Sequence, residues 1–279
     1  MLISRTPLRI SIGGGGTDLP SYYQRFGGFF ISAAIDKHIF VAINKTFRDD
    51  YFLKYSALER ANTIDEIEHP IIREALRLHE IGPAVEIVSL ADIPAGTGLG
   101  SSGSFTVGLL NALYAYRLES PEKSELAEQA CHIEMNLLGR PVGKQDQYIA
   151  AFGGLSCFEI DVDGRVSAKR LAMEPEALDD LEDHLLMFFT GYSRSSGEML
   201  EDQRTRSSRD DPAMLDNLHF IKDLGLRIKD TLEGGDIHGF GELMHEHWLH
   251  KRKRSKGMSN PASTAGMKPA ERTAPSAEN

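Results

Sequence analysis

The sequence is poor in cysteine and has fewer basic than acidic residues. Its two cysteines, Cys131 and Cys157, form neither a CxxC pair nor a metal-ligand spacing. We expect both thiols to be reduced, as they are in a reducing compartment. Lysine and arginine total 31 against 41 aspartate and glutamate residues, a formal net charge of −10. This balance excludes a generic nucleic-acid binder, because such proteins present a basic face.

Long apolar segments are also missing. The most apolar stretch, FFISAAIDKHIFVAI, is interrupted by Asp36 and Lys37, so no membrane span is expected. The first residues, MLISRTPLRISI, lack the continuous apolar core of a signal peptide. We therefore expect a cytoplasmic protein that binds neither membrane nor nucleic acid, and we leave a homodimer open. The basic run at 251–256 is expected to close a helix, whose dipole favours cations there.

The hydrophobic pattern predicts a chain of mixed helices and strands. Strands are expected at residues 2–12, within 29–55, at 84–90, in a hairpin that turns at Asp163 and Gly164, and at 184–190. Helices are expected at 66–80, about 101–117, 120–138, 195–206, 212–232 and 236–252. The last 25 residues contain no aromatic, leucine, isoleucine or valine residue, so they are expected to be disordered.

The segment PAGTGLGSSGSF, which begins at Pro94, lacks a lysine where a P-loop has one. It lies between an expected strand and an expected helix, an arrangement that presents backbone N–H groups to a phosphate. A formal GxGxxG within it admits a dinucleotide fold. That fold needs a strand ending in an acidic residue about 20 positions further on, but Glu119 and Glu122 lie in an expected turn. The segment is interpreted as a phosphate-binding loop, with a simple serine helix cap as the alternative.

Three acidic residues are candidates for chemistry. Glu134 lies at the edge of an apolar helix stripe and needs a cation. That cation is either Mg²⁺ shared with a serine hydroxyl and phosphates, or a buried arginine or lysine. Asp146, between two glutamines, suits a base toward a substrate hydroxyl, or a helix cap. Asp18 follows four glycines and suits sugar hydroxyls, or again a cap, and Arg9 projects from the preceding strand.

These stretches, in this order, resemble the GHMP small-molecule kinases. The pattern PAGTGLGSS is specific to that superfamily, and Gly103 stands where the family usually has alanine. PLRISIGGGGTD resembles the first motif of its sugar-kinase branch. With SAAIDKHIFVAI, SFTVGLLNALYAY, GKQDQY and HEHW…KRKRSKGMSN, the likeness is greatest to kinases of D-glycero-D-manno-heptose 7-phosphate. It runs from about residue 3 to residue 260.

The resemblance implies an α+β fold of two domains. Residues 1–155 are expected to form a mixed α/β domain of the ribosomal-protein-like type, which carries the ATP and Mg²⁺ site. Residues 156–254 are expected to form an incomplete ferredoxin-like α/β domain, followed by a disordered tail at 255–279. The third motif of the family, a GAGGGG-like turn, is not found after Asn260. From this we expect a truncated chain with lowered stability and weak or absent turnover.

The implied reaction transfers the γ-phosphoryl group of ATP to a sugar hydroxyl. The acceptor implied is D-glycero-D-manno-heptose 7-phosphate at its anomeric position, with galactose, fucose or a nucleotide-binding relative without turnover as alternatives. Asp146 would activate the hydroxyl, Arg9 would lie near the transferring phosphoryl group, and Ser102 and Glu134 would hold Mg²⁺. The residues expected to bind ATP are Pro94, Gly96, Thr97, Gly98, Leu99, Gly100, Ser101, Ser102 and Gly103. The residues expected to bind the acceptor are Gly16, Thr17, Asp18, Lys144 and Arg194, the last two through its phosphate.

Overall fold

A computed structural model of the chain describes residues 1–188 and 197–254. Arg194 and the expected tail at 255–279 lie outside the described residues. Within the described part, helices and strands mix in one molecule, which confirms the expected α+β class. None of the described helices has both the length and the apolar character to cross a membrane.

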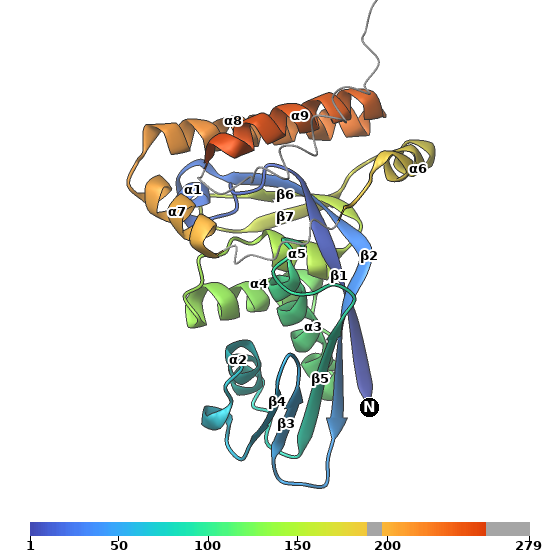
Figure 1. Cartoon of the computed structure of the whole chain (residues 1–279), viewed down its shortest axis with the longest axis vertical. Helices are drawn as coiled ribbons and strands as arrows, with labels where there is room; N and C mark the ends of the chain where they lie inside the picture. Colours follow the sequence, from blue (N-terminus) through green and yellow to red (C-terminus); the bar gives the residue numbers. More distant parts are fainter. Residues whose placement is uncertain (189–196, 255–279) are drawn as a thin grey trace, which may run out of the picture.

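A mixed sheet forms the centre of the molecule (Figure 1). Its described strands are β1 (Leu2–Gly13), β2 (Gly28–Lys45), β3 (Tyr51–Lys54), β4 (Leu58–Ala61), β5 (Val85–Ala91), β6 (Leu155–Ile160) and β7 (Val166–Arg170). They follow the order β4-β3-β5-β2-β6-β7, with β1 paired to β2. β2 pairs with β5 near one end and with β6 near the other. The sequence predicted several shorter strands in this region, but the chain runs through Asp36 and Lys37 as one strand, with both side chains exposed.

Helices cover both faces of the sheet where β1, β2 and β6 meet. The helices are α1 (Pro20–Phe26), α2 (Pro70–Leu78), α3 (Ser101–Tyr116), α4 (Lys123–Cys131), α5 (Gln145–Phe152), α6 (Pro175–His184), α7 (Gly197–Ser208), α8 (Pro212–Glu233) and α9 (Ile237–Arg254). Short turns of helix lie at Ile64–Glu66 (η1) and His132–Leu137 (η2). On β2, Phe30 belongs to the core cluster of α5, whereas Phe29 and Ile31 belong to that of α8. Because successive side chains of a strand point to opposite faces, α5 and α8 lie on opposite sides.

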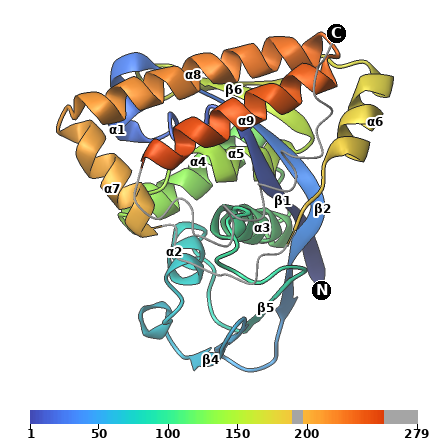
Figure 2. The same ribbon diagram turned by 45° about the horizontal axis from the view of Figure 1, so that its top comes forward.

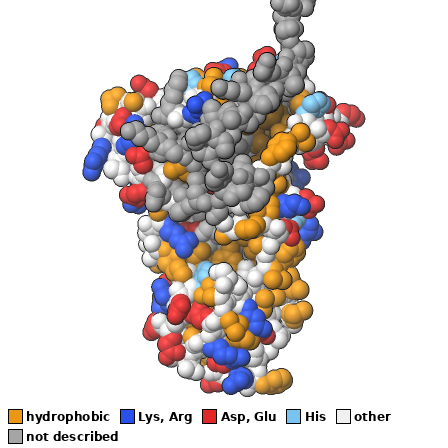
Figure 3. Space-filling model, viewed as in Figure 1, with side chains coloured by type: hydrophobic (Ala, Val, Ile, Leu, Met, Phe, Trp, Pro, Cys, Tyr) orange, Lys and Arg blue, Asp and Glu red, His pale blue; other side chains and the backbone are white. Residues whose placement is uncertain are grey.

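The view in Figure 2 shows α8 and α9 side by side across the top of the sheet, in contact with each other. In Figure 3, hydrophobic side chains gather along the lower right edge, over β1, β2 and β5. These strands include the exposed Leu2 and Ile3 of β1 and Leu90 of β5.

β6 and β7, from the expected second domain, continue the sheet of the first. The division at residue 155 stays a prediction.

Further expected elements differ from the structure. The expected strand at 184–190 is wrong in its described part, because His184 ends α6 and residues 185–188 form no strand. Leu186 and Phe188 are each 78% exposed there. A strand requires a hydrogen-bonded neighbour, and no described strand pairs with this segment. The expected helix at 120–138 begins at Lys123 and changes at His132 into the π-helix η2.

The hairpin of β6 and β7 is confirmed. It closes through the turn that contains Asp163 and Gly164, and Gly164 has a φ of 86°. The strand, loop and helix around residue 94 are also confirmed as β5 and α3. This arrangement places the glycine-rich segment at the end of a central strand, where the candidate site is built.

Candidate active site

The glycine-rich loop leads from β5 to the first residue of α3, Ser101. Gly96, Gly98 and Gly100 have φ values of 81°, 81° and 74°, which L side chains rarely adopt. Gly100 is the N-cap residue of α3, and no described side chain caps this helix end. The alternative of a simple serine cap is therefore not observed. The first N–H groups of a helix have no partner within the helix, so they remain suited to an anion.

Arg9 joins this loop to Asp146. The backbone N–H of Arg9, on β1, donates to the carbonyl of Leu99 at 3.1 Å, and its Nη1 donates to the carbonyl of Gly98 at 2.7 Å. Its Nε donates to Asp146 Oδ1 at 2.7 Å. Asp146 lies in the first turn of α5 and does not cap it, because the N-cap residue is Lys144. The helix-cap alternative for Asp146 is therefore wrong.

Gly103 lets α3 approach α5 closely enough to place the loop beside Asp146. A Cβ atom at residue 103 would lie 2.6 Å from Asp146 Cβ and 3.1 Å from the backbone nitrogen of Gln147. The alanine usual in the family would therefore require one of these helices to shift in this chain. The structure therefore shows the close approach that the sequence predicted from a small residue at position 103.

Asp18 reaches the same helix start from another segment. Its carboxylate accepts the N–H of Gly16 at 2.9 Å and the N–H of Gln145 at 3.0 Å. Burial raises the pKa of Asp18 above its ordinary value, and the charge of Asp146 adds to this effect. Asp18 does not cap α1, whose N-cap residue is Leu19. The structure thus brings Asp18, Asp146 and Arg9 together from three parts of the sequence.

Thr17 and Gly16 hold the turn around Asp18. The hydroxyl of Thr17 lies 2.8 Å from the carbonyls of Gly14 and Phe29, and its side chain is fully buried. The expectation that Thr17 contacts the acceptor is corrected by this burial, which leaves no surface for a ligand. Gly16 contributes its carbonyl to Gln203 Nε2 at 2.9 Å.

Glu134 and Ser102 lie in contact, as expected for ligands of one metal ion. Glu134 is fully buried within the π-helix η2. Gln147 and Thr106 donate to its Oε1 at 2.9 and 3.3 Å. Ser102 donates to its Oε2, and Arg140 Nη1 donates to the same oxygen at 3.2 Å. The sequence had left a buried arginine open as the partner of Glu134, but it had not singled out Arg140.

This donor set fits Mg²⁺ brought in with a nucleotide. Mg²⁺ prefers oxygen ligands and usually keeps waters and phosphates beside one or two carboxylates. Ser102 and Glu134 offer one hydroxyl and one carboxylate. The described residues contain no group of three or more metal-binding side chains. The protein therefore offers a partial shell, which phosphate oxygens would complete, and the metal role of both residues stays a prediction.

The ammonium group of Lys144 has partners outside this centre, although the backbone N–H of Lys144 donates to the carbonyl of Asp18 at 3.4 Å. Its Nζ contacts Glu128 Oε1 at 2.6 Å and the carbonyl of Gly164 at 2.7 Å, and only 8% of its side chain is exposed. We correct the expectation that Lys144 binds an acceptor phosphate, because its ammonium group is already held by a carboxylate and a carbonyl. The matching expectation for Arg194 lies outside the described residues.

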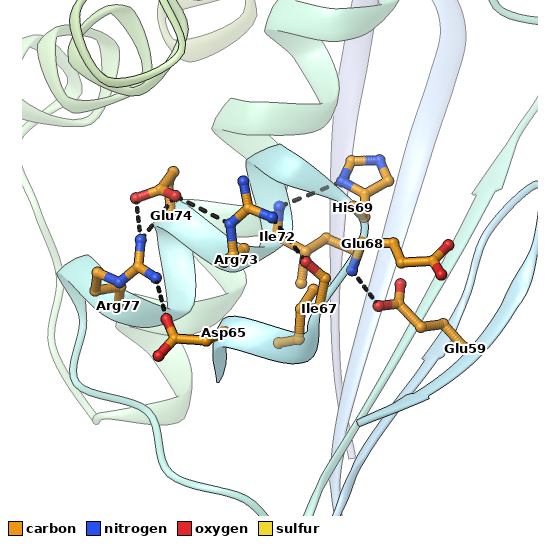
Figure 4. Close-up of polar contacts among 9 residues, drawn as sticks. All are labelled: Glu59, Asp65, Ile67, Glu68, His69, Ile72, Arg73, Glu74 and Arg77. Atoms are coloured by element: carbon orange, nitrogen blue, oxygen red, sulfur yellow. Dashed lines mark hydrogen bonds and ion pairs between the residues drawn. The ribbon is translucent and has the colours of Figure 1, made fainter. Parts of the chain in front are cut away.

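The residues around the start of α2, shown in Figure 4, form a wall beside the first turns of α3 that the sequence did not predict. His69 caps α2 by accepting the N–H of Ile72 at 3.3 Å, and Arg73 donates to the carbonyl of Ile67 at 2.9 Å. The ring of His69 lies 5.2 Å from that of Phe105, in the first turns of α3. Burial lowers the pKa of His69, and the nearby Arg140 lowers it further. This wall and Arg140 therefore border the same side of α3.

Comparison with known proteins tests these inferences. Residues 62–154 match the GHMP kinases N terminal domain, a span that contains the loop, Glu134 and Asp146. The chain is 26% identical to a D-glycero-alpha-D-manno-heptose 7-phosphate kinase of Campylobacter jejuni, over 92% of this chain and 79% of that protein. It is also similar to the crystal structure of a D-glycero-D-manno-heptose 1-phosphate kinase from Bacteroides thetaiotaomicron, with a TM-score of 0.76 and 26% identity over 90% of this chain and 80% of that one.

The chain therefore contains a GHMP kinases N terminal domain.

The chain is also 24% identical to an L-fucokinase/L-fucose-1-P guanylyltransferase of Bacteroides fragilis, over 92% of this chain but 31% of that longer protein. The expected likeness to the GHMP kinases, the expected fold and the general class, a phosphotransferase that acts on an alcohol group, are confirmed by these matches. The GHMP kinases use ATP as the phosphate donor, as the sequence led us to expect. The roles of single residues stay predictions.

Proposed function

We propose that this protein transfers the γ-phosphoryl group of ATP to the anomeric hydroxyl of a heptose phosphate, with D-glycero-D-manno-heptose 7-phosphate as the first candidate. Two similar proteins are named as kinases of heptose phosphates, which supports this acceptor class. The observation that carries the proposal is the contact of Arg9 with both Asp146 and the carbonyl of Gly98 in the glycine-rich loop. A candidate base and a candidate phosphate site are thereby joined by one cation.

Asp146 is proposed to accept the proton of the acceptor hydroxyl. The contacts from Arg9 to Asp146 fall on Oδ1, so Oδ2 is the oxygen proposed to face the acceptor. Asp18, held by two backbone N–H groups beside Asp146, is proposed to orient the sugar through its hydroxyls. Phosphoryl transfer depends mostly on such positioning and on charge stabilisation, because the protein has little covalent chemistry to perform.

The phosphates of ATP are proposed to lie on the N–H groups at the start of α3. Ser102 and Glu134 would hold Mg²⁺, which when bound neutralises charge on the phosphate oxygens. Arg9, whose side chain is 13% exposed, would add a fixed positive charge on the other side of the loop. These two sources of charge would replace the lysine that the loop lacks.

An assay of ADP release with ATP and Mg²⁺ tests the proposal. The acceptors to compare are the heptose 7-phosphate, the same heptose without its phosphate, galactose and fucose. We expect the highest kcat/KM with the heptose 7-phosphate. A higher kcat/KM with an unphosphorylated sugar would refute the proposed acceptor. ATP binding by calorimetry without turnover of any sugar would instead favour the nucleotide-binding relative.

A further inference from the structure

The two carboxylate oxygens of Glu134 are held by different kinds of groups. Gln147 and Thr106 are neutral and buried, and they donate to Oε1 at 2.9 and 3.3 Å. Oε2 receives the hydroxyl of Ser102 and Nη1 of Arg140. The neutral contacts therefore fix the carboxylate in the protein, while Oε2 faces the start of α3 together with the only charged partner that the described contacts give Glu134.

Arg140 contacts both oxygens that are proposed to bind Mg²⁺. Its Nη1 lies 2.9 Å from Ser102 Oγ and 3.2 Å from Glu134 Oε2. A metal ion bound to these two oxygens would occupy the region where this nitrogen now lies. Two cations cannot share that position, because their repulsion is poorly screened beside a fully buried carboxylate.

The surroundings of Arg140 also allow its side chain to move away from Glu134. It follows the π-helix η2 and Gly139, outside any helix or strand. One third of its side chain, 33%, is exposed, against 1% for Glu134. It borders a groove of about 600 Å³ that is also lined by Tyr23, His132 and Arg204. The guanidinium group can therefore move into the groove without crossing a packed core.

We propose that Arg140 is a resident counter-ion of the metal site. Before nucleotide binds, its guanidinium group neutralises Glu134 and holds Ser102 beside it, and it gives up this position when Mg²⁺ arrives with the nucleotide. A buried carboxylate without a cation is strongly destabilising, which explains why the site needs a placeholder. Arg140 is thus a positioning residue. The inference rests on the proposed function, since it assumes a nucleotide–Mg²⁺ complex as ligand.

The test compares Arg140→Met and Arg140→Lys with the wild-type chain. Arg165→Met serves as the control, because Arg165 forms an exposed ion pair with Asp163 in the hairpin turn. Thermal unfolding and calorimetric ADP binding are measured over a series of Mg²⁺ concentrations, without any acceptor. A hydrogen bond to a charged group is strong enough that its loss shifts an equilibrium constant by about tenfold or more.

We expect Arg140→Met to melt below the wild type without Mg²⁺ and to recover when Mg²⁺ and ADP are added. The Mg²⁺ concentration that half-saturates the stimulation of ADP binding should fall by about tenfold. Arg140→Lys keeps the charge but loses the geometry of the guanidinium group. Its half-saturating Mg²⁺ concentration should therefore lie between those of Arg140→Met and the wild type. If Arg140→Met does not fold, a lower half-saturating Mg²⁺ concentration in Arg140→Lys than in the wild type tests the same inference.

Equal Mg²⁺ midpoints in the variants and the wild type would overturn the inference. A higher midpoint in Arg140→Met would also overturn it, since Arg140 would then assist the metal instead of preceding it. The proposed function fails separately, if the wild-type chain neither responds to Mg²⁺ in ADP binding nor phosphorylates any sugar. If the wild type phosphorylates a sugar but the Mg²⁺ midpoints of the Arg140 variants equal its own, only the proposed role of Arg140 is refuted.

Discussion

Replacing Asp146 by asparagine should separate catalysis from structure at the pair that joins Arg9 to the loop. Asparagine has nearly the same size and keeps an oxygen that can accept from Arg9 Nε, now 2.7 Å from Asp146 Oδ1. It loses the charge and the ability to take a proton. We expect turnover to fall by about 10²–10⁴, the usual contribution of a positioned base. This factor corresponds to about 3–5 kcal/mol of activation free energy.

The loss of folding stability should be smaller. The side chains of Arg9 and Asp146 are 13% and 31% exposed, so water partly screens their attraction. Arg9 also keeps its hydrogen bond to the carbonyl of Gly98. We expect the free energy of unfolding to fall by about 1–2 kcal/mol, below the full strength of a charged hydrogen bond. Domains are stable by about 5–15 kcal/mol, so the variant remains folded.

Three measurements are needed on Asp146→Asn. ADP release gives turnover, calorimetry gives the affinity for ATP with Mg²⁺, and thermal unfolding gives stability. The control is Asp163→Asn, an acidic residue exposed in the hairpin turn. Loss of ATP binding together with turnover would show that Asp146 is structural. Turnover within a few-fold of the wild type would refute its role as the base.

Three further substitutions test the surroundings of this pair. Glu134→Gln should raise the Mg²⁺ concentration needed for half-maximal turnover, and an unchanged metal titration would remove Glu134 from the metal site. Burial raises the pKa of Asp18, so its contribution to stability is present below an ordinary pKa of about 3.9 and is lost as pH rises through the raised value. Asp18→Asn should remove this fall in stability in denaturant unfolding over a pH series, and parallel curves would contradict the assignment. A Cβ atom at Gly143 would lie 2.0 Å from Asp18 Oδ2, so Gly143→Ala should reduce stability by about 1–3 kcal/mol and raise KM for the acceptor. Gly82→Ala, with no atom within 4 Å of the added group, is its control, and equal melting temperatures for the two would refute the predicted clash.

Local patterns predicted several elements of the fold well. The strand, glycine-rich loop and helix from Val85 to Tyr116 could be predicted because apolar periodicity and turn residues act over short distances. The hairpin through Gly164 followed from the same rules. The length of β2 did not follow from local rules, because the continuity of β2 depends on β1, which pairs with β2 along most of that length. Leu186 and its neighbours show the converse, since an apolar run without a partner strand formed no strand.

The sequence by itself determined which residues are suited to the chemistry. It identified a glycine-rich phosphate loop, a buried carboxylate in need of a cation, and Asp146 and Asp18 as further acidic groups, because these properties depend on residue type and short spacing. Only the tertiary structure decided which of these residues contact one another. Arg9 meets Asp146 across 137 positions, and Arg140 meets Ser102 across 38. It also paired the ammonium group of Lys144 with Glu128. Charge and hydrogen-bond partners act through space, so only the folded chain shows which cation neutralises which carboxylate.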